Sequence, residues 1–75
     1  MKLSELKIGE SAKVKGINTS KTLKDRLNYM GLTYGVIVTV IRFSPFGDPI
    51  EIKLRDFLMA IRMSDAEKIL VEKII

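Results

Sequence analysis

The pattern of apolar and polar residues along the chain is mostly that of short β-strands. In the first such run Ala12 and Val14 alternate with Lys13 and Lys15, the period of two that marks a strand with one buried face. The first strand is expected at residues 11–17, and further strands are expected at residues 50–55, 58–62 and 71–74.

Residues 36–43 form the most strand-like run, because β-branched residues fill it and suit a pleated surface. The run is apolar almost without interruption, which predicts burial on both faces in the middle of a small barrel. Further along, a tight hairpin turn is expected at Asp56-Phe57.

One stretch has the spacing of a helix. Its apolar residues recur at i, i+4 and i+7 and predict a stripe that packs into the core, made of Leu23, Leu27 and Met30. Thr19 or Ser20 can cap its first turn, because a hydroxyl oxygen accepts a hydrogen bond from a free backbone amide. Gly31 stands where a left-handed residue ends many helices.

Shorter helical turns are expected near both ends of the chain. Residues 3–8 suggest one turn, and Ser64 with Glu67 matches the Ser-x-x-Glu capping box of another that extends to about Lys68. The fold class is therefore mainly β: a small, strongly bent five-stranded barrel with one helix inserted after the first strand and a short helical turn near the C-terminus. A barrel would also remove the bare edges of an open sheet.

The connection Ser44-Pro45-Phe46-Gly47-Asp48-Pro49 is rich in turn-forming residues. Pro45 fixes φ, Gly47 can adopt a positive φ, and the Asp48 side chain can accept hydrogen bonds from nearby amides. One interpretation is a rigid connector that sets the register of its two strands. The other is a docking site, because an aromatic residue on a stiff loop, Phe46, loses little entropy when it is immobilised.

Composition removes most kinds of chemistry. The 75 residues include no cysteine and no histidine, which excludes disulfides, thiol nucleophiles, thiolate or imidazole metal sites and the usual general base. The nine acidic residues are scattered, so a converging oxygen site for a hard cation is not expected. The net charge of +4 is compatible with RNA or with an acidic protein partner and is diagnostic of neither.

No apolar run approaches the roughly 20 residues that span a bilayer, and the first residues lack the apolar core of a secretion signal. A cytoplasmic protein of one domain, residues 1–75, is expected.

Three blocks of the sequence together resemble the FeoA family. They fall in the family's order and spacing over nearly the whole chain: Arg26-Leu27-x-x-Met30-Gly31-Leu32-x-x-Gly35, then Pro45-x-Gly47-Asp48-Pro49, then Ala60-Ile61-Arg62 followed by Ser-x-Ala-x-x-Ile. Asp56 departs from the pattern, which has a glycine in this hairpin, although aspartate tolerates the left-handed region better than most residues.

The resemblance implies an SH3-like barrel and a small accessory role in ferrous iron uptake. The implied partner is the cytoplasmic part of FeoB, a membrane permease with a GTPase domain. The chain itself is expected to be neither an enzyme nor membrane-spanning, to hold no cofactor beyond a weak association with divalent metal, and to be a monomer or weak homodimer. The apolar pairs Leu70-Val71 and Ile74-Ile75 would either close the barrel or support such a dimer.

The candidate partner-binding residues are aromatic. Tyr29, Tyr34 and Phe46 are suited to interfaces, and the ring of Tyr34 is expected near the Ser44–Pro49 loop. Arg26 and Asp48 are weaker candidates that could pair with each other. A structural role is expected for the remaining motif residues, which are Gly31, Gly35, Pro45, Gly47, Pro49 and Arg62. Of these, Arg62 is expected to pair with Asp65 or Glu67.

Two other functions remain open. In an RNA-binding barrel, seven basic residues could form a positive face: Lys13, Lys15, Lys21, Lys24, Arg42, Lys53 and Arg55. Acidic neighbours interleave with them, and no nucleic acid partner is expected. A regulatory domain would bind a transition metal weakly through carboxylates and carbonyls, or stimulate a GTPase with Arg26 or Arg42 as an arginine finger.

Overall fold

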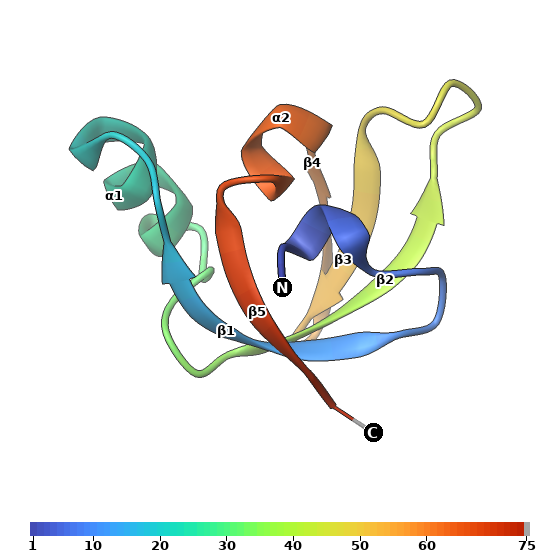
Figure 1. Ribbon diagram of the computed structural model, residues 1–75, viewed down its shortest axis with the longest axis horizontal. Coiled ribbons are helices and arrows are strands. Elements are labelled where there is room, and N and C mark those ends of the chain that lie inside the picture. The colour runs from blue at the N-terminus through green and yellow to red at the C-terminus, as the bar shows by residue number, and fades with distance from the viewer. Residues whose placement is uncertain (75) are drawn as a thin grey trace.

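Residues 1–74, which the computed structural model describes, form one antiparallel sheet of five strands with short helices at its open side (Figure 1). The strands are β1 (Ser11–Ile17), β2 (Ile37–Phe43), β3 (Ile50–Leu54), β4 (Phe57–Ile61) and β5 (Ile69–Ile74), in the spatial order β4-β3-β2-β1-β5. The helices are η1 (Leu3–Glu5), α1 (Lys21–Tyr29) and α2 (Met63–Ala66). The predicted mainly β class with its inserted helix is confirmed; Ile75 lies outside the described residues.

The sheet is strongly bent, and its concave side holds the core (Figure 1). The register shifts between Val14 and Gly16 and again between Val40 and Arg42, and such irregularities increase local twist and bend a strand. Buried side chains come from every strand, and Val14, Val38 and Ile52 are examples that are fully buried. No polar side chain is buried among residues 1–74, so the interior is entirely apolar.

Burial of β2 on both faces, which its apolar sequence predicts, is wrong. Val38 and Val40 are fully buried, but Ile37 is 51% exposed and Ile41 is 36% exposed. The helices lie on the concave side of the sheet, so the outer side chains of β2 face solvent. Buried and exposed side chains therefore alternate along the first part of β2, although the sequence does not distinguish them because nearly all are apolar.

The barrel is not closed by strand pairing, contrary to the expectation from sequence. The edge of β5 is partly covered by the start of the chain: Lys2 bridges to Leu70, and the Val71 amide donates to the Met1 carbonyl at 2.8 Å. At the other edge, β4 pairs only with β3 within the described residues. The sheet thus keeps one free edge.

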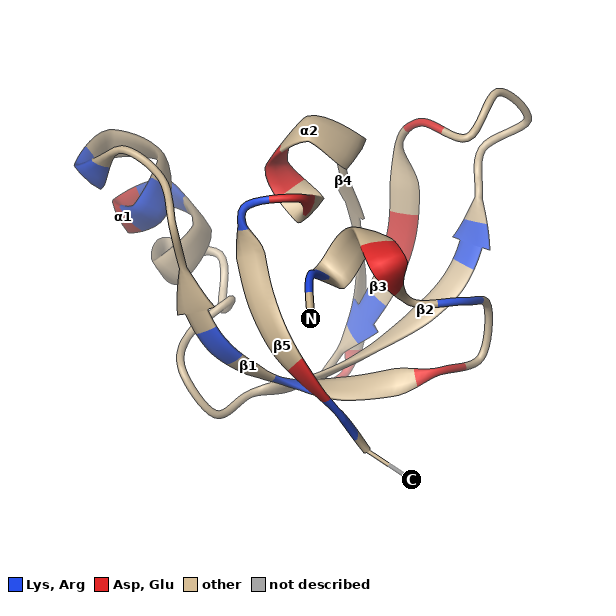
Figure 2. Cartoon of the chain, in the orientation of Figure 1, with Lys and Arg blue, Asp and Glu red and all other residues tan. Residues whose placement is uncertain are grey.

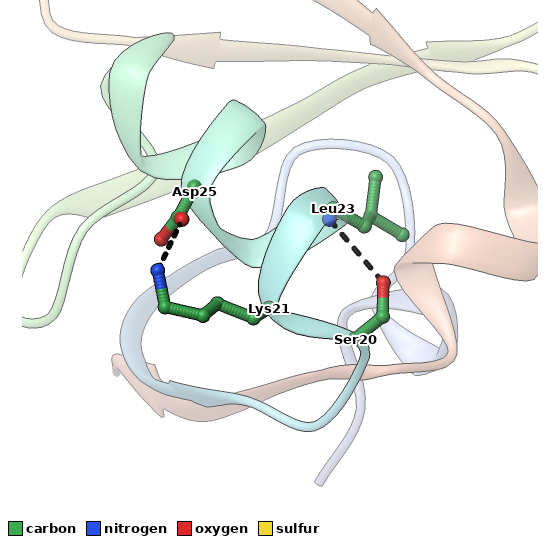
Figure 3. Close-up of polar contacts among 4 residues, drawn as sticks. All are labelled: Ser20, Lys21, Leu23 and Asp25. Atoms are coloured by element: carbon green, nitrogen blue, oxygen red, sulfur yellow. Dashed lines mark hydrogen bonds and ion pairs between the residues drawn. The ribbon is translucent and has the colours of Figure 1, made fainter.

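Local interactions hold α1 as its sequence predicts. The Ser20 hydroxyl accepts a hydrogen bond from the Leu23 amide at 3.3 Å, and Lys21 pairs with Asp25 one turn away at 3.0 Å (Figure 3). Leu27 is buried, whereas Met30, the last residue of the predicted stripe, is exposed. The stripe is therefore only partly core.

The hairpin between β3 and β4 turns at Arg55 and Asp56, because Leu54 and Phe57 are already paired. Arg55, and not Asp56, adopts the positive φ of 53°. The glycine-like position of the turn is thus one residue earlier than the sequence comparison suggests, and Phe57 belongs to the strand.

Gly31 ends α1 and cannot be replaced without strain. Its φ is +107°, and a Cβ atom there would lie 3.3 Å from Cδ1 of Leu54. We expect Gly31→Ala to lower the free energy of unfolding by about 1–3 kcal/mol, since both backbone strain and crowding oppose it. Gly16→Ala is the matched control: a Cβ there meets nothing within 4 Å, so the same urea titration should change by less than about 1 kcal/mol. Equal losses in the two variants would contradict this interpretation.

Glu10 links the segment before β1 to the neighbouring strand β5. Its carboxylate pairs with Lys73 of β5 and accepts from the Lys7 amide at 2.7 Å. The hydrogen bond with Lys73, and then that with the Lys7 backbone, lower the pKa of Glu10 below its ordinary value of 4.5.

A lowered carboxyl pKa contributes stability above the ordinary value and loses it as the pH falls through the folded-state value. Glu10→Gln should therefore unfold more easily than the wild type at pH 7, and the difference should shrink as the pH falls below about 4.5. Thermal unfolding from pH 7 to pH 2 measures this. Glu67→Gln removes the same charge from a carboxylate that has no ion pair among residues 1–74, and so corrects for net charge. A pH-independent difference for Glu10→Gln would exclude the effect.

Candidate functional site

The connection between β2 and β3, residues 44–49, is a braced loop at one end of the molecule. The Ser44 amide donates to the Pro49 carbonyl at 3.1 Å, and the Gly47 amide donates to the Ser44 carbonyl at 2.7 Å. Gly47 adopts a φ of +84°, as its place in the turn predicts. Phe46 lies at the tip with 96% of its side chain exposed. The loop therefore holds an aromatic ring in solvent on a hydrogen-bonded base.

Asp48 connects this loop to α2. Its Oδ1 atom accepts a hydrogen bond from the Met63 amide at 2.9 Å and so caps the first turn of the helix from a distant part of the chain. The capping box predicted for Ser64 and Glu67 is wrong, because the helix begins at Met63 and its N-cap residue is Arg62. The sequence predicts that Asp48 binds nearby backbone amides, but the amide that it binds is fifteen residues away.

A groove of about 480 Å³ lies at the foot of the loop. It is lined by the base of the loop and the neighbouring strands: Arg42, Phe43, Ser44, Pro45, Pro49, Ile50, Glu51 and Ala60. Arg42 and Glu51 form an ion pair at 3.3 Å along one wall, which leaves the apolar residues to contact a bound group. The exposed ring and the groove together offer a protein-docking surface, which we call the loop surface (residues 42–51 with Ala60).

The two tyrosines are exposed but lie elsewhere. Tyr29, 94% exposed, ends α1, and Tyr34, 70% exposed, lies in the turn before β2. These segments are at the opposite end of β2 from the Ser44–Pro49 loop (Figure 1), so the expected proximity of Tyr34 to that loop is wrong. Tyr34 instead has the Lys15 ammonium 5.5 Å from its ring centre, a cation–π contact that the sequence did not reveal.

The two motif arginines face a second groove. Arg26 of α1 and Arg62, together with Met30 and Met59, line about 250 Å³ between α1 and β4. Neither arginine forms an ion pair with a carboxylate of residues 1–74, so the pairs proposed from sequence, Arg26 with Asp48 and Arg62 with its own helix, are not present. Both guanidinium groups are exposed.

Charged residues do not gather into a site of one sign. Basic and acidic residues occur together in α1, β3 and β5 (Figure 2), and several are paired, as in Lys15–Glu72 and Arg42–Glu51. Residues 1–74 contain no group of three or more Asp or Glu side chains arranged to hold a metal ion. No helix in that range is long and apolar enough to cross a membrane. The features of the site that are available for binding are its groove and its exposed apolar residues.

The comparisons with known proteins agree with this architecture. A sequence model of the FeoA domain matches residues 1–73. The chain belongs to the FeoA family. It is 34% identical over 74 residues to the Fe(2+) transport protein A/Fe(2+) transporter FeoB fusion protein of Porphyromonas gingivalis, and the match covers 99% of this chain. The chain spans only 9% of the length of that fusion protein.

FeoA proteins of known structure share the fold. The solution structure of FeoA from Chlorobium tepidum superposes with a TM-score of 0.94 at 40% identity, over all of this chain and 71% of that one. FeoA from Stenotrophomonas maltophilia, solved with zinc and described as an SH3 domain protein, superposes with a TM-score of 0.83 at 28% identity, over 96% of this chain and 89% of that one. The SH3-like fold predicted for the chain is confirmed.

The cap supplied by Asp48 can be tested by removing its oxygen. Asp48→Ala should destabilise the protein by about 0.5–2 kcal/mol and speed hydrogen exchange of the Met63 amide, because that amide loses its partner. Asp48→Asn keeps an oxygen in place and should remain close to the wild type. NMR-detected exchange measures both variants; unchanged protection of Met63 in Asp48→Ala would show that the bond contributes nothing.

Proposed function

We propose that this FeoA-family chain is an accessory domain of ferrous iron uptake that binds the cytoplasmic part of a FeoB-type permease. The observation that carries the proposal is the match to a protein whose name joins Fe(2+) transport protein A to the transporter FeoB in a single chain. Fusion raises the effective concentration of one module at the other, which is useful when two modules work in contact.

The loop surface suits this role. Phe46 extends from a base that is already hydrogen-bonded and tied to α2 through Asp48, so binding would cost little conformational entropy. Aromatic anchors of this kind supply much of the free energy in protein interfaces. The adjacent apolar groove offers a place for a side chain of the partner.

The alternatives have weaker physical support. An RNA-binding face needs uncompensated positive charge, and three of its seven candidate residues, Lys15, Lys21 and Arg42, pair with carboxylates. Weak metal binding and stimulation of a GTPase by Arg26 or Arg42 stay predictions for direct measurement. We propose no catalytic role for the chain itself.

Binding to a FeoB-type permease in lipid nanodiscs tests the proposal. Phe46→Ala should raise the dissociation constant at least about tenfold, because the ring is the most exposed large apolar group of the loop. Tyr29→Ala is the matched control, an equally exposed aromatic at the other end of the molecule, and should bind like the wild type.

The measurement should be repeated without nucleotide, with GDP and with a non-hydrolysable GTP analogue, at low and physiological salt. Absence of binding under all these conditions would refute the proposed partner. Equal loss in the two variants would leave the partner but refute the loop surface as the contact.

A further inference from the structure

The free edge of β4 lacks the features that usually protect such an edge. Its five residues, Phe57–Ile61, include no charged residue and no proline, and no bulge interrupts its pairing with β3. Natural proteins generally place such features on an open edge to prevent pairing with another strand. Because the β5 edge is partly covered by Met1 and Lys2, this difference between the two edges is a distinctive feature of the molecule.

The hairpin determines which backbone groups point outward. A two-residue turn makes Leu54 and Phe57 a hydrogen-bonded pair, and the alternation of an antiparallel ladder then gives bonded pairs at Ile52–Met59 and Ile50–Ile61. The N–H and C=O groups of the residues between them, Leu58 and Ala60, therefore point away from β3.

Both outward-facing residues are accessible. The Leu58 side chain is 55% exposed, and Ala60 is exposed as well. Grooves meet at Ala60 from both sides: one of about 440 Å³ is shared with Pro49 and Arg62, and the other lies between β4 and α1. Leu23, Leu27 and Met30 form the far wall of the second groove, so an added strand would lie between β4 and this helical segment.

The sequence of the edge is complementary to itself. In an antiparallel pair of two β4 strands with the two-fold axis at Met59, Leu58 of each copy is opposite Ala60 of the other, and the outward groups form four backbone hydrogen bonds. A large side chain then meets a small one twice. In the same register, Asp56 of each copy is opposite Arg62 of the other, and Arg62 has no ion pair among residues 1–74.

Neighbouring registers lose this match. A shift that places Ala60 opposite Ala60 brings Leu58 opposite Arg62, and the opposite shift brings Leu58 against Leu58; neither pairs the charges. Oppositely charged cross-strand pairs stabilise a register by roughly 0.2–1 kcal/mol each, and like charges oppose it.

We propose that the β4 edge is a self-association site, at which a second copy of this chain adds its own β4 to make a continuous ten-stranded sheet. The occupant is the identical strand because the edge offers complementary size and charge to itself. The ladder is short and the contact is small, so the dimer is weak, with a dissociation constant in the micromolar to millimolar range. The contact uses Ala60, which also lines the groove of the loop surface, so the two surfaces share this residue.

Sedimentation equilibrium from about 10 μM to 1 mM tests the proposal on the whole chain. The wild type should shift from monomer to dimer across this range. Ala60→Pro removes the outward N–H without breaking a bond to β3, and edge positions tolerate proline, so the variant should fold and stay monomeric. Ala60→Ser, which keeps both the N–H and a small side chain, should associate like the wild type.

Charge exchange tests the register. Asp56→Arg and Arg62→Asp should each weaken self-association about five- to thirtyfold, because like charges then face each other at both ends of the ladder. An equimolar mixture of the two variants should associate about as tightly as the wild type, since the introduced arginine of one chain then faces the introduced aspartate of the other. Circular dichroism checks that each variant is folded.

A wild type that is monomeric at 1 mM would refute the proposal and leave the edge to a strand from another protein. A dimer that survives Ala60→Pro would also refute it, because another surface must then be used. A dimer that is lost in Ala60→Pro but is indifferent to both charge exchanges would refute the register through Met59.

Discussion

The structure depends on burial of a single face of one bent sheet. A chain of this length has enough apolar surface for one core, and that core lies on the concave side, where Val14, Val38 and Ile52 meet Leu27 from the inserted helix. Register shifts in β1 and β2 provide the bend that encloses it. The convex side is then open to solvent, which is why apolar residues such as Ile37 and Leu58 remain exposed. The exposed apolar residues that this single core does not bury are the ones available to bind a partner.

Much of this fold could be predicted because its signals are local. The period of two gives the bounds of β1 correctly, and the Ser20 cap and Gly31 terminator of α1 depend on residues a few positions apart. The errors concern long-range geometry. An apolar run such as β2 does not reveal which of its faces is covered. Ser64 matches a capping box, but the oxygen that caps α2 comes from Asp48, which only the folded sheet brings close.

The candidate site was predicted in its parts but not in its arrangement. Exposure of Phe46, Tyr29 and Tyr34 follows from their positions in turns and at a helix end. Their distribution over opposite ends of the molecule follows from the length and direction of β2, which no pattern of residue types encodes (Figure 1). The free edge of β4 could not be predicted either, because the sequence indicates five strands but does not show whether the two edge strands, β4 and β5, pair with each other.

The hydrogen bond between Asp48 and the Met63 amide also links the loop surface to the segment that follows the free β4 edge. Asp48 and Pro49, from the loop, share a wall with Ala60 and Arg62, from the end of β4. A ligand that displaced the loop would pull on the first turn of α2, and α2 follows directly on the free strand. Through this one side chain, the loop that carries Phe46 is connected to the helix that directly follows the edge strand.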